Sequence, residues 1–224
     1  MNRTPDDDTQ GQNVPGSDTG AARIVNIVGE RVALGPFRRD LVPAYQRWIN
    51  DFTTMRTYGT PRPLTVEQAT AWYEKQTTKE ERARFTVYEL ATWRPIGKTA
   101  LYDIDFHHRT AEFGIIIGEP DCRGKGYGTE AALLTLDYAF TALELHNVML
   151  EVAEFNQAGR RVYAKAGFRE FGRRRQSWMM GGRLWDVIYM DCLATEFSSP
   201  VLGSVFVPDQ ANPSTPEVAH DDER

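Results

Sequence analysis

The hydrophobic and polar positions along the chain alternate with two different periods, which predicts a domain built from both strands and helices. A period of two residues or a short apolar run predicts strands at 31–37, 84–91, 98–106, 111–118, 147–153, 168–180 and 183–193. Apolar residues at helical spacing predict helices at 40–50, from residue 65 onward, at 128–143 and at 156–167. Strands both precede and follow the helices, so we expect a mixed sheet covered by helices, an α+β or α/β sandwich.

Boundary residues agree with this arrangement. Asp40 is expected to cap the first helix, and Thr65 opens the second. Asn156 can cap the last helix, and Gly167 suits the left-handed position at its end. Gly181–Gly182 between the last two strands predicts a tight hairpin.

The net charge of −5 is distributed unevenly along the 224 residues. Residues 1–22 carry one arginine against four aspartates, and residues 198–224 carry one arginine against five acidic residues. Both ends are rich in Pro, Gly, Ser, Asp and Thr, so we expect two disordered acidic tails around one folded domain at 23–197. The apolar run Val201–Val207 could instead pack on that domain.

The composition, 41% hydrophobic and 25% charged, is typical of a soluble globular protein. The sequence has no apolar run of about 18 residues and no signal-peptide pattern, which argues against a membrane protein. Cys122 and Cys192 are the only cysteines, which favours free thiols in the cytoplasm. The aromatic residues are not interleaved with a basic stripe, so no nucleic-acid partner is expected.

The segment Arg123–Gly128, Arg-Gly-Lys-Gly-Tyr-Gly, lies between an apolar strand and a long helix. Glycines at alternate positions let the backbone turn and approach a ligand, and the first N–H groups of the helix can bind phosphate. A nucleoside triphosphate loop would need Ser or Thr after Lys125, where Gly126 stands. The glycine spacing also differs from the dinucleotide fingerprint.

Two segments resemble the GNAT acetyltransferase superfamily. Residues 123–128 are similar to its acyl-CoA pyrophosphate loop, Arg/Gln-x-x-Gly-x-Gly/Ala. Asn156–Gly159 followed by Tyr163, Lys165 and Gly167–Phe168 is similar to the segment that closes its active site. The resemblance covers about residues 30–195 and is greatest to the ribosomal-protein and spermidine acetyltransferase branch.

This resemblance implies a central, mostly antiparallel, splayed sheet flanked by helices. It implies acetyl-CoA as the acyl donor and a small primary amine as the acceptor, such as a polyamine, an amino-acid derivative or an antibiotic. The amine would attack directly in a ternary complex, and the protein would form a homodimer. Acetylation of a protein N-terminus, or a regulatory module that binds CoA without catalysis, are the alternatives.

The resemblance also implies which residues hold acetyl-CoA. The backbone of Ile115, Ile116 and Ile117 would pair with pantetheine like an added strand. Asn156 would bind the pantetheine arm, and Lys165, with Arg160 as a second candidate, would meet the adenosine phosphates. The pyrophosphate would bind the backbone N–H groups of Arg123, Gly124, Lys125, Gly126, Tyr127, Gly128 and Thr129.

Acyl transfer to an amine requires a base for the amine and an acid for the departing thiolate. Tyr163 is the candidate acid, because a phenol of pKa ~10 is protonated at neutral pH; core packing is its other interpretation. Glu112 is the candidate base, with Glu151 and Glu154 as competitors, and a chain of water molecules could replace all three.

The acceptor pocket is expected to form from the first two helices and the final hairpin. Its aromatic candidates are Trp48, Tyr58, Trp72, Tyr73, Trp178 and Trp185. Asp103 and Asp105 could attract a cation or be exposed strand ends. Arg173–Arg175 would repel a polycation, or could simply form a solvated edge strand.

Overall fold

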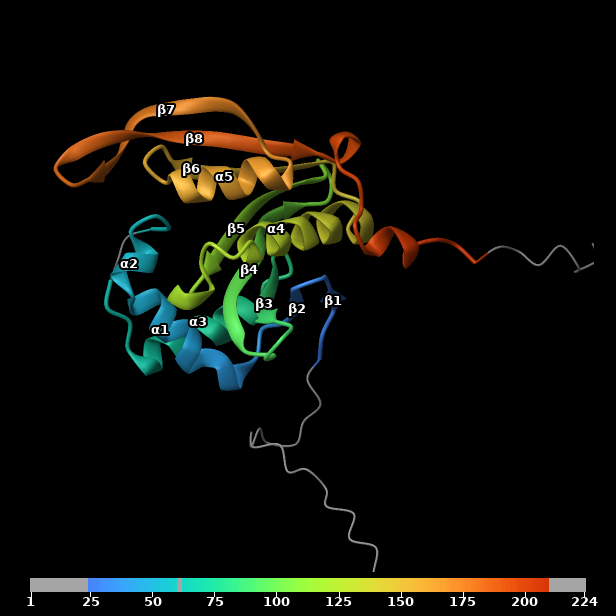
Figure 1. The fold of residues 1–224 in the computed structure, drawn as a ribbon, viewed down its shortest axis with the longest axis horizontal. Helices are drawn as coiled ribbons and strands as arrows, with labels where there is room; N and C mark the ends of the chain where they lie inside the picture. The colour runs from blue at the N-terminus through green and yellow to red at the C-terminus, as the bar shows by residue number, and fades with distance from the viewer. Residues whose placement is uncertain (1–23, 60–61, 210–224) are drawn as a thin grey trace, which may run out of the picture.

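The computed structural model describes residues 24–59 and 62–209. Eight strands form one sheet in the order β1-β2-β3-β4-β5-β6-β8-β7 (Figure 1). The strands are β1 (Ile27–Val28), β2 (Val32–Pro36), β3 (Ala83–Glu89), β4 (Pro95–Asp105), β5 (Thr110–Ile117), β6 (Asn147–Ala153), β7 (Arg169–Met180) and β8 (Arg183–Leu193). All neighbouring strands are antiparallel except β5 and β6, which are parallel.

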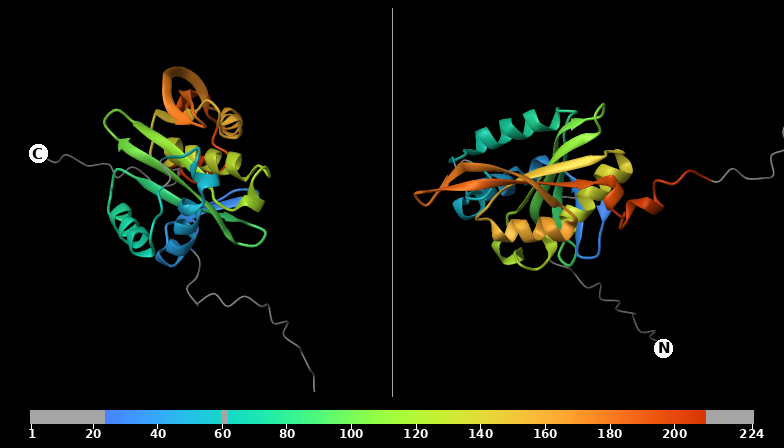
Figure 2. Two further views of the ribbon diagram at one scale, coloured as in Figure 1. Left: turned by 90° about the vertical axis from the view of Figure 1, so that its left-hand side faces the viewer. Right: turned by 90° about the horizontal axis from the view of Figure 1, so that it is seen from above.

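Helices cover both faces of this sheet. They are α1 (Val42–Asn50), α2 (Phe52–Met55), α3 (Val66–Thr77), α4 (Tyr127–Asp137) and α5 (Gln157–Ala166). Short turns of other helix types occur at Arg39–Leu41, Pro120–Cys122, Tyr138–Ala142, Ala194–Glu196 and Leu202–Ser204. In Figure 2, right, α3 lies on one side of the sheet and α4 and α5 lie on the other. The sheet is therefore the middle layer of three, as the sequence pattern predicts.

Alternate strand residues face the two helix layers. On β4, Thr99 faces α4, where its hydroxyl lies 3.1 Å from that of Thr135. Its neighbour Lys98 faces α3, with its ammonium 4.6 Å from the centre of the Trp72 ring. On β3, the Thr86 hydroxyl lies 2.6 Å from the hydroxyl of Tyr45 on α1. Lys98 and Thr86 thus belong to a polar inner face of β3 and β4 that contacts α1 and α3.

The predicted boundary signals are confirmed in most places. Thr65 forms a complete capping box at the start of α3. The Asn156 side chain accepts a hydrogen bond from the N–H of Gly159, 3.0 Å away. Gly167 ends α5 at φ 107°. Gly181 and Gly182 have φ values of 60° and 72°, as a tight hairpin turn requires.

The prediction that Asp40 caps the first helix is wrong. Asp40 lies in the preceding turn, where both its carboxylate oxygens accept hydrogen bonds from Arg38. The helix starts at Val42 with proline in its first turn, where the missing N–H costs nothing. Asp51 is a cap instead: its carboxylate accepts from the N–H groups of Thr53 and Thr54 and so starts the short helix α2, which the sequence pattern did not reveal.

The sheet splits between β5 and β6. Their ladder joins only Thr110–Glu112 to Asn147–Met149. Beyond Glu112, β5 continues alongside β4 to Ile117, whereas β6 stays paired with β8 along its whole length. The edge of β5 that faces β6 therefore has no neighbouring strand from residue 113 onward, which confirms the predicted splayed sheet.

The chain after β8 packs against α4. Asp137, 0% exposed, accepts hydrogen bonds from the N–H groups of Val201 and Leu202 and from the Ser199 hydroxyl. The Leu202 side chain is buried in the core between the sheet and α4. The sequence left two expectations for this segment, disorder or packing on the domain. Packing is what the structure shows for residues 199–202. Most of the two predicted tails, namely residues 1–22 and 210–224, lies outside the described residues.

Candidate active site

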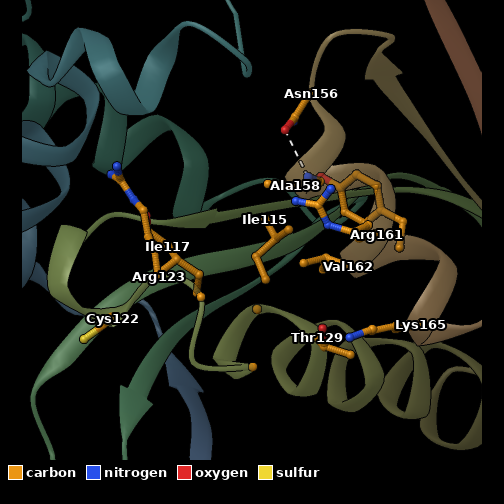
Figure 3. A pocket seen from close by; sticks show the side chains of 15 residues that line it. Ile115, Ile117, Cys122, Arg123, Thr129, Asn156, Ala158, Arg161, Val162 and Lys165 are labelled. Atoms are coloured by element: carbon orange, nitrogen blue, oxygen red, sulfur yellow. Dashed lines mark hydrogen bonds between the residues drawn. The ribbon is translucent and has the colours of Figure 1, made fainter.

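A groove of about 380 Å³ lies where the sheet splits, between β5, the glycine loop and α5 (Figure 3). It is lined by Ile115, Ile117, Cys122, Arg123, Gly124, Gly126, Gly128, Thr129, Asn156, Ala158, Gly159, Arg161, Val162, Tyr163 and Lys165. Most of the predicted cofactor-binding residues are therefore together. Ile116 points to the other face and is buried, so only its backbone could contribute, as the prediction states.

The glycine loop has the conformation that its sequence predicts. Gly124 and Gly126 have φ values of 73° and 86°, in the region that favours glycine. A side chain at Gly126 would meet the Arg31 guanidinium at 2.8 Å. That guanidinium donates to the Lys125 carbonyl at 3.1 Å and so holds the loop. Because Gly126 has no side chain to cap α4, the first N–H groups of the helix are free to bind an anion.

The Arg123 side chain does not add its charge to the loop. It points away from the groove toward α2 (Figure 3), where it donates to the Thr54 hydroxyl at 2.6 Å and lies 3.5 Å from the Asp51 carboxylate. Its Nε also donates to the Ile117 carbonyl at 3.3 Å. Arg123 therefore ties α2 to the end of β5.

The basic residues of α5 divide between two roles. Lys165 lines the groove as predicted, and in Figure 3 its side chain points toward the first turn of α4. Arg160, the second candidate, faces away and pairs with Glu170 at 3.9 Å. Arg161 lines the groove instead. The sequence could have predicted that Arg161 lines the groove with Lys165, because residues four apart on a helix share a face.

Cys122 lies at the loop but is 1% exposed. Burial raises the pKa of its thiol above the ordinary value, although the neighbouring Arg94 guanidinium opposes this rise. The thiol packs in the core between the sheet and α4.

A second cavity, of about 530 Å³, lies on the face of the sheet that carries α3. Its lining comes from α1, α2, α3, α5 and strands β3 to β7, with the turns beside them. It comprises Ile49, Met55, Thr57, Tyr58, Trp72, Gln76, Arg82, Arg84, Lys98, Tyr102, Asp103, Glu112, Phe113, Gly114, Glu151, Val152, Asn156, Tyr163 and Trp178. Asn156 and Tyr163 line both this cavity and the groove. The two spaces therefore meet at these residues, in the split of the sheet.

Tyr163 is largely surrounded by protein. Its ring makes edge contacts with Phe113 and Phe168, at 6.1 and 6.0 Å between ring centres. Burial raises the pKa of its phenol to about 12. Its hydroxyl has no hydrogen-bond partner among the residues that the structure describes. Tyr163 is thus a protonated donor at the junction of the two cavities.

The three candidate bases differ in position. Glu112, the last β5 residue paired with β6, lines the second cavity together with Glu151. Burial, and then the negative charges of Glu151 and Asp103, raise the pKa of the Glu112 carboxyl above its ordinary value. Glu154 lies outside the cavity lining and pairs with Arg173 at 3.2 Å.

Some of the aromatic candidates belong to this cavity and others to the core. Tyr58, Trp72 and Trp178 line it. Trp48 is buried and donates to the Glu119 carboxylate at 2.8 Å. Tyr73 and Trp185 are also absent from the lining.

Of the two aspartates expected near a cation, Asp103 lines the cavity. Asp105 instead accepts a hydrogen bond from the N–H of His108 at 2.8 Å. Sequence reasoning also missed three cations in the lining, Arg82, Arg84 and Lys98. Each is an even-numbered residue of β3, β4 or the turn before β3, so strand alternation could have placed them on this face.

The fold and the two joined cavities define an acyltransferase of the GNAT type. A family model described as "Acetyltransferase (GNAT) domain" matches residues 31–169. The chain belongs to this family: it is a GNAT N-acetyltransferase, and acetyl-CoA is its acyl donor.

Several relatives are N-acetyltransferases. The chain is 33% identical to the spermidine N(1)-acetyltransferase of Vibrio cholerae over 150 residues, 66% of this chain and 86% of the relative. It is 29% identical over 156 residues to the human alpha/beta-tubulin-N-acetyltransferase 9, with 64% and 75% covered. A crystal structure of the V. cholerae spermidine enzyme with CoA and spermine has a TM-score of 0.69 and 30% identity, and the match covers 74% of this chain and 97% of that chain.

No helix in the described ranges 24–59 and 62–209 is long and apolar enough to cross a membrane. The homodimer and the cytoplasmic location stay predictions.

Proposed function

We propose that this protein transfers the acetyl group of acetyl-CoA to a primary amine of a small molecule, by direct attack in a ternary complex. The supporting observation is that the groove and the second cavity meet at Tyr163 and Asn156. A donor in the groove and an amine in the cavity can then react without a covalent enzyme intermediate.

The groove residues fit CoA. The free N–H groups that start α4 would bind the pyrophosphate, and Arg161 and Lys165 would bind the phosphates of the adenosine part. The unpaired edge of β5 at Ile115–Ile117 would pair with the pantetheine arm. Bound acetyl-CoA supplies the activated acyl carbon and a thiolate leaving group.

Tyr163 would act as the general acid. Its hydroxyl stays protonated at neutral pH, since burial raises its pKa to about 12. It would hydrogen-bond to the departing sulfur and donate a proton as the carbon–sulfur bond breaks.

Glu112 would act as the general base. A carboxylate with a raised pKa accepts a proton more readily than an ordinary glutamate, which suits removal of a proton from an ammonium group. Its place on the cavity wall beside Glu151 would also attract the cationic amine before reaction.

The test is a panel of primary amines incubated with acetyl-CoA, with release of the CoA thiol as the readout. At least one amine should be acetylated, and Tyr163→Phe should reduce its turnover without weakening CoA binding. If calorimetry shows CoA binding but no amine in the panel is acetylated, the protein would be a CoA-binding module instead.

A protein N-terminus is a second candidate acceptor, because the chain is similar to tubulin acetyltransferases from several animals. An intact-mass increase of one acetyl group on a peptide substrate, with no small amine accepted, would favour it.

A further inference from the structure

The second cavity, which would hold the acceptor and is called the acceptor cavity from here on, has a buried lysine without a counter-charge in its wall. Lys98 is 6% exposed. Its ammonium lies 4.6 Å from the Trp72 ring centre, and it has no hydrogen-bond or ion-pair partner within residues 24–59 and 62–209. A cation–π contact compensates only part of the hydration that a buried ammonium loses.

Arg84 lies beside Lys98 in the same wall. Its guanidinium is held 4.8 Å from the Tyr102 ring centre and 5.6 Å from that of Trp72. Its Nη2 donates to the neutral Gln76 amide at 2.6 Å, while its Nε is buried without an acceptor. Rings and an amide thus position Arg84 but leave its charge uncompensated.

The third cation, Arg82, provides a contrast. It has a carboxylate beside it, because Asp103 lies 3.5 Å away. The uncompensated positive charge of the cavity is therefore concentrated at Arg84 and Lys98. Burying two such charges is costly unless a ligand supplies the opposite charge.

The other end of the cavity is acidic. Glu112 and Glu151 line it, and neither has an ion-pair partner in the described part of the chain. Glu112 pairs with Tyr102 in the ladder, so Lys98 lies four residues further along β4, roughly 13 Å away along the strand. Arg84, opposite Ala100, lies between these two levels. A small molecule can span this separation.

We propose that the acceptor carries a carboxylate or a similar anionic group, which binds Arg84 and Lys98 while its primary amine lies between Glu112 and Tyr163. This proposal rests on the proposed acetyl transfer and names its substrate class as an amino acid or an acid-bearing amine. A polyamine would place a second positive charge against Arg84 and Lys98, where it is repelled. Spermidine, the substrate named for the bacterial relatives, is therefore expected to be a poor acceptor here.

The first experiment compares unbranched ω-amino acids of increasing length with n-alkylamines of matched length that lack the carboxylate. We expect the best amino acid to exceed its matched alkylamine in kcat/KM by at least about tenfold, the value of one charge-assisted hydrogen bond. Lys98→Met should remove this preference and should raise kcat/KM for the alkylamine. Lys75→Met, which removes an exposed α3 lysine outside the cavity, should leave both values unchanged.

Equal kcat/KM for the two series, or a preference for spermidine that Lys98→Met does not alter, would overturn the proposal while acetyl transfer itself stands. A second measurement does not depend on turnover. Calorimetry on the CoA complex should show binding of an N-acetylated ω-amino acid that is lost in Lys98→Met, and no binding of the matched N-alkylacetamide. Equal binding of both compounds would also overturn it. Failure of the proposed function would appear differently, as the absence of turnover with every amine.

Discussion

The Lys98 ammonium faces the Trp72 ring at 4.6 Å in the wall of the acceptor cavity. Lys98 comes from the central strand β4 and Trp72 from α3, so the pair connects the sheet to the helix layer above it. Burial, and then the charge of Arg84, lower the pKa of Lys98 to about 7. The fold therefore keeps an ionisable group where an apolar one would be more stable.

Lys98→Met is expected to stabilise the protein. The lysine pKa is ~10.4 in an unfolded chain and about 7 in the fold, so the folded state disfavours the charged form. The free energy of unfolding that the buried charge removes is largest below pH 7. This loss shrinks by about 1.4 kcal/mol per pH unit between pH 7 and the unfolded pKa. The gain in melting temperature of Lys98→Met should therefore be largest at pH 6 to 7 and decrease toward pH 10. A gain that does not depend on pH would show that Lys98 is uncharged or well solvated.

Tyr163→Phe is expected to reduce kcat by about 100-fold or more, the usual contribution of a positioned general acid. The ring contacts with Phe113 and Phe168 need no hydroxyl, so the fold and the affinity for CoA should persist. Steady-state kinetics beside calorimetry with CoA would separate the two effects. A parallel loss of kcat and of CoA affinity would instead assign Tyr163 a binding role.

Glu151→Gln is expected to shift the pH dependence of catalysis. The charge of Glu151 helps to raise the pKa of Glu112, and Glu112 must be ionised to act as a base. Removing that charge lowers the Glu112 pKa, so the acid limb of the kcat/KM profile should move to lower pH. Glu154→Gln is the control, because Glu154 pairs with Arg173 outside the cavity. An unmoved limb in Glu151→Gln would argue for proton loss to water.

Arg161→Met is expected to weaken CoA binding by about tenfold, as the loss of a charged hydrogen bond to phosphate would. Arg160→Met removes the same charge one residue earlier, from a side chain that pairs with Glu170. It should leave CoA affinity nearly unchanged. Calorimetry with CoA and with dephospho-CoA would show whether the 3′-phosphate is the partner. Equal losses in the two variants would indicate only a general effect of charge.

Asp137→Ala is expected to destabilise the fold by about 3 kcal/mol, because it leaves the N–H groups of Val201 and Leu202 without their acceptor in a buried place. Urea unfolding would measure the loss. Thr141→Val removes only one 2.8 Å bond to the same carboxylate and should cost less. If the two variants are equally stable, the segment after β8 contributes little to the fold.

The sequence pattern predicted the mixed sheet and the glycine loop because these depend on local rules. The split of the sheet was expected only from the resemblance to the GNAT superfamily. The left-handed glycines of the loop, the Asn156 cap and the hairpin glycines each have a short-range signature, and each is confirmed. Asp40 shows the limit of such rules. It is a good capping residue, but Arg38 binds its carboxylate and the helix starts two residues later.

The acceptor cavity could not be predicted in the same way. Its lining joins residues from four helices and five strands, and no short motif links them. Arg123 shows the same difficulty, because Asp51 and Thr54, about 70 positions earlier in the sequence, draw its charge away from the loop. Contacts between residues far apart in the sequence determine where these side chains lie.

The split between β5 and β6 also has a kinetic consequence. The CoA groove and the acceptor cavity approach Tyr163 from the two sides of the same opening, so neither ligand needs to cross the other's site. Acetyl-CoA and the amine should therefore bind in either order, with intersecting lines in double-reciprocal plots. A single molecule in which CoA is joined to an amino acid through its sulfur would pass through the opening and occupy both sites, and would compete with both substrates at once.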